Sequence, residues 1–147
     1  MQNEYELKLF EELTPAELYG ILKLRMEIFI VEQQRSYKEI DGNDSKALHY
    51  FKKENDEIIA YARIFEAGVT FDCVSIGRIV VKENYRKVGL GRELVHNCIQ
   101  IAKQKWNSPI KISAQLHLEN FYRSFGFEPI SEIYNKDKVP HLNMILN

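Results

Sequence analysis

The stretch YRKVGLGRE, residues 85–93, decides the fold that this sequence predicts. It follows an apolar run at residues 75–81 that is typical of a strand, and it opens residues 90–106, whose apolar side chains recur at helical spacing. A strand that enters a helix through a glycine turn points free backbone N–H groups at one spot, where the helix dipole adds positive charge. Phosphate oxygens suit that spot. The two glycines alone leave two alternatives open, a phosphate seat or a steric turn beside solvated basic residues.

Two common phosphate-binding patterns do not fit the stretch. A P-loop needs GxxxxGK followed by Ser or Thr, and a dinucleotide-binding GxGxxG needs a third glycine where this sequence has leucine. Gly89 and Gly91 nevertheless permit positive φ and lack the Cβ atoms that would keep a pyrophosphate away. Arg86, Lys87 and Arg92 can add charge-assisted contacts to an anion.

A third pattern fits the glycine turn. Arg86, Gly89 and Gly91 match the order Arg or Gln, two residues, Gly, one residue, and Gly or Ala. This order resembles the acetyl-CoA motif of the Gcn5-related N-acetyltransferases, the GNAT superfamily. Downstream, NFYRSFGF at residues 120–127 resembles the family's YxxxGF segment, in which Tyr122 takes the place of the tyrosine near the coenzyme sulfur.

Departures from the family pattern are few. Lys87 stands where the family usually has glycine, but it keeps the backbone donor. Gln115 replaces the asparagine usually found seven residues before Tyr122, and Asn120 is the alternative for that coenzyme contact. Within the family, the sequence resembles the ElaA branch, whose substrate is poorly defined, at residues 24–25, 29–33, 41–44, 49, 61–63, 114–117 and 140–141.

The resemblance implies that acetyl-CoA is the co-substrate and lies in a splay between two parallel strands, near Val80 and Ala114. The pyrophosphate is expected on the N-terminus of the helix that begins at Leu90, and the pantetheine arm along the preceding strand. The implied coenzyme contacts are Ile79, Val80, Val81, Arg86, Lys87, Val88, Gly89, Leu90, Gly91, Arg92, Gln115, Asn120 and Tyr122.

The length of 147 residues predicts a single domain, residues 1–147, of the α/β (mixed α+β) class. Thr14, Pro15 and Glu17 form a helix start with a cap, a first-turn proline and a capping-box glutamate. The predicted strands are residues 5–10, 48–53, 57–65, 73–81, 110–114, 127–134 and 141–146, and the predicted helices are residues 15–31, 90–106 and 117–124. The resemblance implies a central mixed, mostly antiparallel twisted sheet with a splayed parallel pair. The polar loop at residues 32–47 is predicted to be a lid on the substrate side.

Charge and composition argue against several classes of partner. The formal net charge of −1 supplies no basic field for nucleic acid or an anionic membrane. No apolar stretch approaches the roughly 20 residues of a membrane span, and the start of the chain lacks signal-peptide order, so we expect a cytoplasmic protein. Cys73 and Cys98 are predicted to be buried thiols, and their spacing gives no metal site. Strand edges within residues 127–146 leave a homodimer open.

An amine acceptor must lose a proton, and a thiolate leaving group must gain one or be stabilised. Tyr122 is the candidate general acid, with an aromatic packing role as the alternative. Residues 74–81 contain no glutamate, so the base has to lie elsewhere. Glu32 and His49 are the leading candidates, and each has a purely structural alternative. Asp41, Glu66, His117 and His141 follow behind them.

Arg25, Arg63 and Arg78 fall on apolar segments, where an unpaired charge would be costly. They are expected to pair with Glu32, Asp41 or Glu66, and the alternative is that one of them holds an acidic group of the substrate. The predicted function is an acetyl-CoA-dependent N-acetyltransferase, an acyltransferase that acts on a primary amine of a small molecule or peptide by direct attack. The alternative is a non-catalytic acyl-CoA-binding sensor or scaffold.

Overall fold

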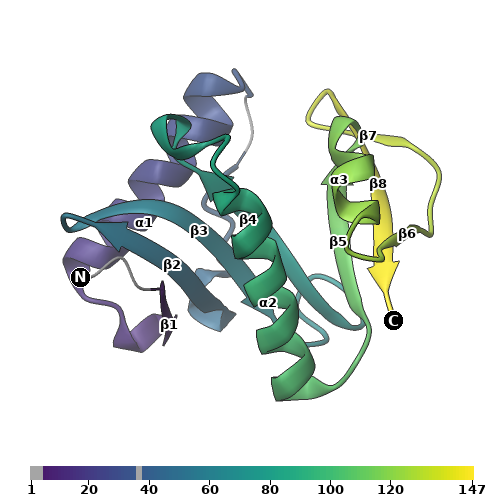
Figure 1. The fold of residues 1–147 in the computed structure, drawn as a ribbon, viewed down its shortest axis with the longest axis horizontal. Coiled ribbons are helices and arrows are strands. Elements are labelled where there is room, and N and C mark those ends of the chain that lie inside the picture. Colours follow the sequence, from purple (N-terminus) through teal and green to yellow (C-terminus); the bar gives the residue numbers. More distant parts are fainter. Residues whose placement is uncertain (1–4, 36–37) are drawn as a thin grey trace.

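The computed structural model of the protein describes residues 5–35 and 38–147, which form a twisted sheet of eight strands with helices on both faces (Figure 1). The strands are β1 (Tyr5–Leu9), β2 (Leu48–Glu54), β3 (Glu57–Phe65), β4 (Val74–Val81), β5 (Ile110–Gln115), β6 (Glu128–Pro129), β7 (Tyr134–Lys136) and β8 (Val139–Leu146). The helices are α1 (Pro15–Arg25), α2 (Leu90–Trp106) and α3 (Glu119–Arg123). The order across the sheet is β1-β2-β3-β4-β5-β8-β6, with β7 on β8, and only β4 and β5 pair in parallel. The mixed, mostly antiparallel fold is confirmed.

The capped start of α1 is as predicted. The Thr14 hydroxyl accepts the Glu17 backbone N–H at 3.0 Å, and the Glu17 carboxylate accepts the Thr14 backbone N–H at 2.9 Å. The helical run ends at Glu32, one residue beyond the predicted end, but its last part, Met26–Glu32, is a π-helical segment, which was not predicted. Such segments are rare and often lie at functional sites.

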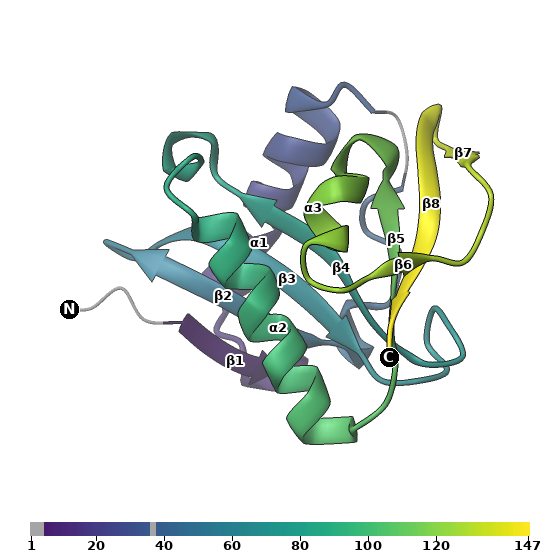
Figure 2. The ribbon, with the colours of Figure 1, turned by 45° about the vertical axis from the view of Figure 1, so that its right-hand side comes forward.

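The two long helices cover opposite faces of the sheet. Figure 2 shows α2 in front of the strands and α1 behind them. Successive side chains of a strand point to opposite faces. Tyr50 accordingly joins the core beneath α2, with Leu94 and Cys98, whereas the adjacent Phe51 joins the core beneath α1, with Ile21.

The strand β4 carries an extra residue at a β-bulge. It pairs with β3 at Val80–Tyr61 and next at Gly77–Arg63, so three steps on β4 match two on β3. Arg78 lies at this point with φ of 50°, in the left-handed region that a non-glycine residue rarely adopts. Beyond the bulge, β4 resumes its pairing with β3 at Val80 and Val81.

The parallel pair opens immediately after it begins. β4 and β5 pair at Val74–Ile110 and Ser75–Lys111, and the remaining residues of β4 have β3 alone as a strand neighbour. β5 continues instead along β8, from Ile110–Leu146 to Gln115–His141. The predicted splay between two parallel strands is therefore present, and Figure 1 shows β4 and β5 diverging toward the top of the view.

The C-terminal strands differ from the prediction. The run predicted at residues 127–134 is not one strand, because only Glu128–Pro129 pairs with β8 before the chain leaves the sheet. Pro129 has no N–H to continue a ladder. A separate strand, β7, then forms a hairpin with β8 through Asp137 and Lys138, which both have positive φ.

The polar loop predicted at residues 32–47 is anchored by buried side chains. Arg35, Glu39 and Asp44 are all buried, and the turn Asp44–Lys46 is a short 3-10 helix. Residues 36–37 lie outside the described residues. The described parts of this loop pack against the sheet beside the splay, so a lid role stays a prediction.

Candidate active site

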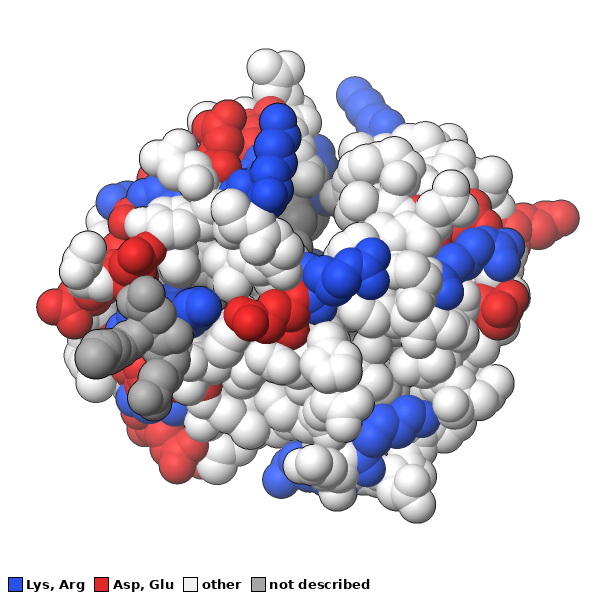
Figure 3. All heavy atoms as spheres, viewed as in Figure 1, with Lys and Arg blue, Asp and Glu red and all other residues white. Residues whose placement is uncertain are grey.

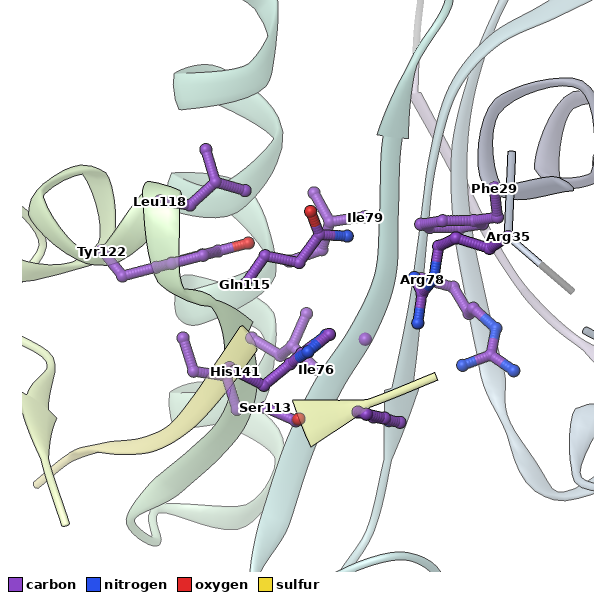
Figure 4. A pocket seen from close by; sticks show the side chains of 13 residues that line it. Phe29, Arg35, Ile76, Arg78, Ile79, Ser113, Gln115, Leu118, Tyr122 and His141 are labelled. Carbon is purple, nitrogen blue, oxygen red and sulfur yellow. The ribbon is translucent and has the colours of Figure 1, made fainter. Parts of the chain in front are cut away.

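A cavity of about 90 Å³ lies in the splay between β4 and β5. Figure 3 shows the surface hollowed between the half of the molecule that carries β4 and the half that carries β5. The lining residues are Phe29, Arg35, Ile76, Gly77, Arg78, Ile79, Ile112, Ser113, Gln115, Leu118, Tyr122, Lys136 and His141. In Figure 4, Arg35 and Arg78 lie on one side of this cavity, and Tyr122, Gln115 and His141 lie on the other.

His141, on β8, presents one free ring nitrogen to this cavity. Its Nδ1 lies 2.7 Å from the Val139 carbonyl oxygen, which can only accept, so Nδ1 carries the proton and Nε2 keeps a lone pair. No residue in the described part of the chain makes a hydrogen bond to that Nε2. Tyr134 stacks on the ring, with centroids 6.1 Å apart. Burial, followed by the charges of Lys136 and Arg35, lowers the pKa of His141, so its neutral form predominates at pH 7.

Tyr122, on α3, lies on the same wall of the cavity. The side chain is buried among aromatic rings, with Phe121 and Phe127 edge-on to it at 5.2 and 6.0 Å. Figure 4 shows its hydroxyl pointing into the cavity. Burial raises the pKa of Tyr122, which keeps the phenol protonated and able to donate.

Gln115, at the end of β5, also points into the cavity, and its amide donates to the Gln33 side chain at 3.3 Å. Asn120, the alternative for the same coenzyme contact, is exposed on α3 and does not line the cavity. Of the two, Gln115 is the one that the fold brings to the splay.

The glycine turn leaves the N-terminus of α2 open. Gly89 is the residue before the helix and has φ of 81°, which a side chain rarely tolerates, whereas Gly91 is an ordinary helical residue. Of the two glycines that permit positive φ, Gly89 therefore adopts it and Gly91 does not. In the described part of the chain no side chain caps α2, in contrast to Thr14 on α1, so its first N–H groups remain available to an anion.

The remaining predicted coenzyme residues surround this turn. Lys87 and Val88 are exposed in it, and Leu90 begins α2. Ile79 lines the cavity, whereas the Val80 side chain is turned into the core beneath α1. Val81 packs at the edge of the α2 core, and Arg92 lies over the rings of Phe121 and Phe125 at 5.3 and 4.9 Å.

Arg86 and Glu32 form an ion pair with each other. The Arg86 guanidinium contacts both Glu32 carboxylate oxygens, at 2.7 and 3.0 Å, and donates to the Val81 carbonyl at 2.9 Å. The pairing lowers the pKa of Glu32, which makes this carboxylate a weak base. These contacts do not favour Glu32 as the base, and its catalytic role stays a prediction. Arg86 joins the glycine turn to the π-helical segment.

His49 is also unsuited to the role predicted for it. The side chain is fully buried, its Nε2 donates to the Asp44 carbonyl at 2.9 Å, and its Nδ1 accepts the Tyr61 hydroxyl at 2.6 Å. Both ring nitrogens are occupied inside the protein, and the residue does not line the cavity. His49 therefore has the contacts of a structural residue. His141, which ranked behind it in the sequence-based prediction, has the position expected of a base.

The three arginines predicted to form ion pairs do so, with partners that differ in part. Arg25 contacts Glu39 at 2.6 Å and Asp44 at 2.7 Å. Arg63 contacts Asp41 and Asp44, and Arg78 contacts Glu39 at 2.8 Å. Asp41 was predicted as a partner, but Glu39 and Asp44 take the places expected for Glu32 and Glu66.

Several cavity residues were not predicted individually as site residues. Arg35 comes from an irregular loop, Lys136 from a hairpin, and Phe29 is aimed by the π-helical segment. Among residues 5–35 and 38–147, no group of three or more His, Cys, Asp or Glu side chains could hold a metal ion. Within the same ranges, none of the helices combines the length and apolar character needed to cross a membrane.

Comparisons with known proteins agree on one family. The model of the acetyltransferase (GNAT) domain matches residues 14–147. The protein ElaA of Escherichia coli strain K12 is 40% identical over 136 residues, which cover 90% of this chain and 89% of that protein. The crystal structure of Escherichia coli ElaA superposes with a TM-score of 0.93 at 37% identity, covering 99% of this chain and all of that chain. An acyl-CoA N-acyltransferase from Pseudomonas aeruginosa superposes with a TM-score of 0.91 at 35% identity, covering 97% and 98%.

Proposed function

Because the chain belongs to the GNAT acetyltransferase family, we propose that it is an N-acetyltransferase, which moves an acetyl group from acetyl-CoA to a primary amine of a small molecule or peptide. The observation that carries this proposal is the placement of His141 and Tyr122 on one wall of the cavity in the splay. One is a neutral imidazole with a lone pair turned to the cavity, and the other is a protonated phenol.

These two groups have complementary proton-transfer roles. The Nε2 lone pair of His141 takes the proton that the amine nitrogen loses when it bonds to the acyl carbon. Tyr122 donates its hydroxyl proton to the sulfur as the carbon–sulfur bond breaks, so that the thiol leaves neutral. General acid–base groups of this kind contribute roughly 10²- to 10⁴-fold to a rate.

The coenzyme is expected to reach the cavity from the turn at Gly89. The uncapped N–H groups of α2 suit its pyrophosphate, and the edge of β4 without a strand partner, near Ile79, suits the amide groups of its pantetheine arm. Gln115 lies where the acyl end would arrive. A cavity of about 90 Å³ is below the roughly 300 Å³ of ordinary ligand pockets, which favours a short acyl group such as acetyl.

Release of free thiol from acetyl-CoA, measured with a panel of primary amines, tests the proposal. We expect release that depends on the amine and falls as the acyl chain is lengthened from acetyl to butyryl and hexanoyl. The rival function, an acyl-CoA sensor or scaffold, predicts tight binding of acetyl-CoA without amine-dependent release. That result would overturn the enzymatic proposal while leaving the coenzyme site in place.

A further inference from the structure

A second cavity, of about 540 Å³, adjoins the first. The two share the lining residues Ile76, Gly77, Arg78, Ser113 and Lys136, so they are neighbouring spaces around the opening between β4 and β5. The second cavity continues to β3, the loop after it, β7 and β8, through Arg63, Phe65, Thr70, Phe71, Ser75, Tyr134 and Asn143. It is large enough for a small acceptor, and the shared wall gives it access to the residues proposed for proton transfer.

The charged residues that line the two cavities all have one sign. Arg35, Arg78 and Lys136 line the first, and Arg63, Arg78 and Lys136 line the second. Among the described residues, neither lining includes an Asp or a Glu. We call Arg35, Arg63, Arg78 and Lys136 the cationic wall.

Carboxylates behind the cationic wall hold its guanidinium groups in place. Asp41 accepts two hydrogen bonds from Arg63, at 2.9 and 3.0 Å, and Glu39 accepts one from Arg78 at 2.8 Å. These carboxylates do not balance the whole charge of the region. Among residues 5–35 and 38–147, four arginines (Arg25, Arg35, Arg63 and Arg78) form ion pairs with four carboxylates (Glu39, Asp41, Asp44 and Asp137), and Lys136 adds a fifth positive charge beside them.

The excess of positive charge affects the pKa of Lys136, a member of the cationic wall. The residue as a whole is exposed, yet burial around its ammonium group, followed by the charges of Arg78 and Arg35, lowers its pKa. A positive potential at this place favours a bound anion, because an uncompensated charge in a partly desolvated site is costly.

We propose that the acceptor is a primary amine that also carries an anionic group, a carboxylate or a phosphate, which the cationic wall binds through Lys136 and its neighbouring arginines. This inference rests on the proposed function, since it names the class of amine that the same site takes. The anionic group is held at the wall, and the amine is directed toward His141 and Tyr122 on the other side of the first cavity.

We expect the phosphates of the coenzyme at the N-terminus of α2, away from the cationic wall. The turn at Gly89 and Leu90 lines a separate hollow with Lys52, Glu54, Ile59, Tyr85, Val88 and Glu93, and none of these residues lines either cavity of the splay. The cationic wall is therefore available to the acceptor when the pyrophosphate occupies the N-terminus of α2.

Matched pairs of amines test the inference. O-phosphoethanolamine is compared with ethanolamine, and alanine with alaninamide, by thiol release from acetyl-CoA. We expect the KM of at least one anionic member to be about tenfold below that of its neutral partner, the effect of one charge-assisted contact. The phosphate pair and the carboxylate pair distinguish the two sources of negative charge.

The variant Lys136→Gln removes one charge of the wall at an exposed position, and Lys138→Gln, on the same hairpin but outside both cavities, is its control. We expect Lys136→Gln to raise the KM of the anionic acceptor about tenfold relative to the KM of its neutral partner. Lys138→Gln should leave all these values unchanged.

A binding measurement keeps the inference testable without turnover. Calorimetric titration of the protein–CoA complex with O-phosphoethanolamine and with ethanolamine should give tighter binding of the phosphate compound, weakened by Lys136→Gln only. Equal KM and equal binding within each pair, or equal losses for both members in Lys136→Gln, would overturn the inference but leave the N-acetyltransferase in place. Absence of thiol release with every amine would overturn the proposed function, and the titration would then decide the inference.

Discussion

Two buried histidines lie in regions of opposite character. His49, on β2, sits among the ion pairs of Arg25 and Asp44, with both ring nitrogens hydrogen-bonded inside the protein. His141 sits across the splay, with Nδ1 bonded to a backbone carbonyl and Nε2 turned to a cavity. Burial is the first cause of the lowered pKa in both. Burial and a shifted pKa are therefore common to both histidines, and the proposal of His141 as the base rests on its vacant nitrogen facing a cavity.

The largest effect expected from this comparison is on catalysis. His141→Gln should lower kcat/KM by about 10²- to 10⁴-fold, because the proton acceptor is lost. His49→Gln is the matched control, expected to keep kcat/KM within a few-fold while losing about 1–3 kcal/mol of stability through its hydrogen bonds. A folded His49→Gln protein that loses as much activity as His141→Gln would reverse the roles of the two histidines.

The pH dependence sharpens the same comparison. A base works in its unprotonated form, and the folded pKa of His141 lies below the ordinary value of about 6.5. The wild-type kcat/KM should therefore be flat above about pH 6.5 and fall only as pH drops below it. The fall of kcat/KM at low pH should be absent in His141→Gln and preserved in His49→Gln. The acceptor for this measurement is an amine whose own pKa lies outside the pH range that is measured.

A comparable effect on stability is expected on the His49 side. Arg25→Met leaves Glu39 and Asp44 buried with less positive charge, and breaking a buried pair costs about 3–5 kcal/mol. Urea unfolding measures the loss. Arg123→Met, which removes an exposed pair with Glu119, should change stability by less than about 0.5 kcal/mol. Equal midpoints for the two variants would contradict a structural role for the network.

A smaller effect is expected at the acid on the cavity side. Tyr122→Phe keeps the aromatic packing and removes only the hydroxyl, so kcat should fall about 100-fold with acetyl-CoA affinity little changed. Single-turnover kinetics and a binding titration separate the two quantities. Unchanged turnover would remove the role of the phenol.

The smallest effect concerns the glycine turn, which acts through its backbone. Gly89→Val places a β-branched side chain at φ of 81°, and strain of this kind should weaken acetyl-CoA binding about tenfold. Lys87→Ala removes a charge but no backbone donor, so a change of less than about threefold is expected. If Lys87→Ala is the worse variant in a binding titration, the side-chain charge carries the site.

The sequence predicted the elements whose structure depends mainly on residues that are close together in the chain. The Thr14 cap and the helix from Leu90 to Trp106 appear as expected, because a capping box and an apolar stripe specify a helix without outside help. The hairpin of β2 and β3 likewise follows from strand composition around a short turn. The glycine turn was interpreted correctly as the uncapped start of a helix.

What the sequence could not predict depends on contacts between distant segments. His141 ranked below His49 because only the folded hairpin brings the Val139 carbonyl to Nδ1 and leaves Nε2 open. Glu32 was predicted as a base because its ion pair with Arg86 joins residues 54 positions apart in the chain, which the sequence does not reveal. Glu39 lies in a loop without helical or strand periodicity, so nothing in the residue pattern indicated a buried ion-pair partner. The long strand predicted at residues 127–134 is a different case, because Pro129, which has no N–H to continue a ladder, already argued against it in the sequence.

The bulge in β4 adds a charged residue to the strand without changing the faces of its neighbours. Between the pairs of Gly77 and Val80, two residues of β4 stand opposite one residue of β3, and Arg78 has the left-handed backbone of the extra residue. Deleting Arg78 would leave Ile79 opposite Ala62, so Ile79 would still face the cavity and Val80 the core beneath α1. A regular strand without Arg78 would therefore keep the same apolar faces, and what the bulge adds is a guanidinium group at the cavity.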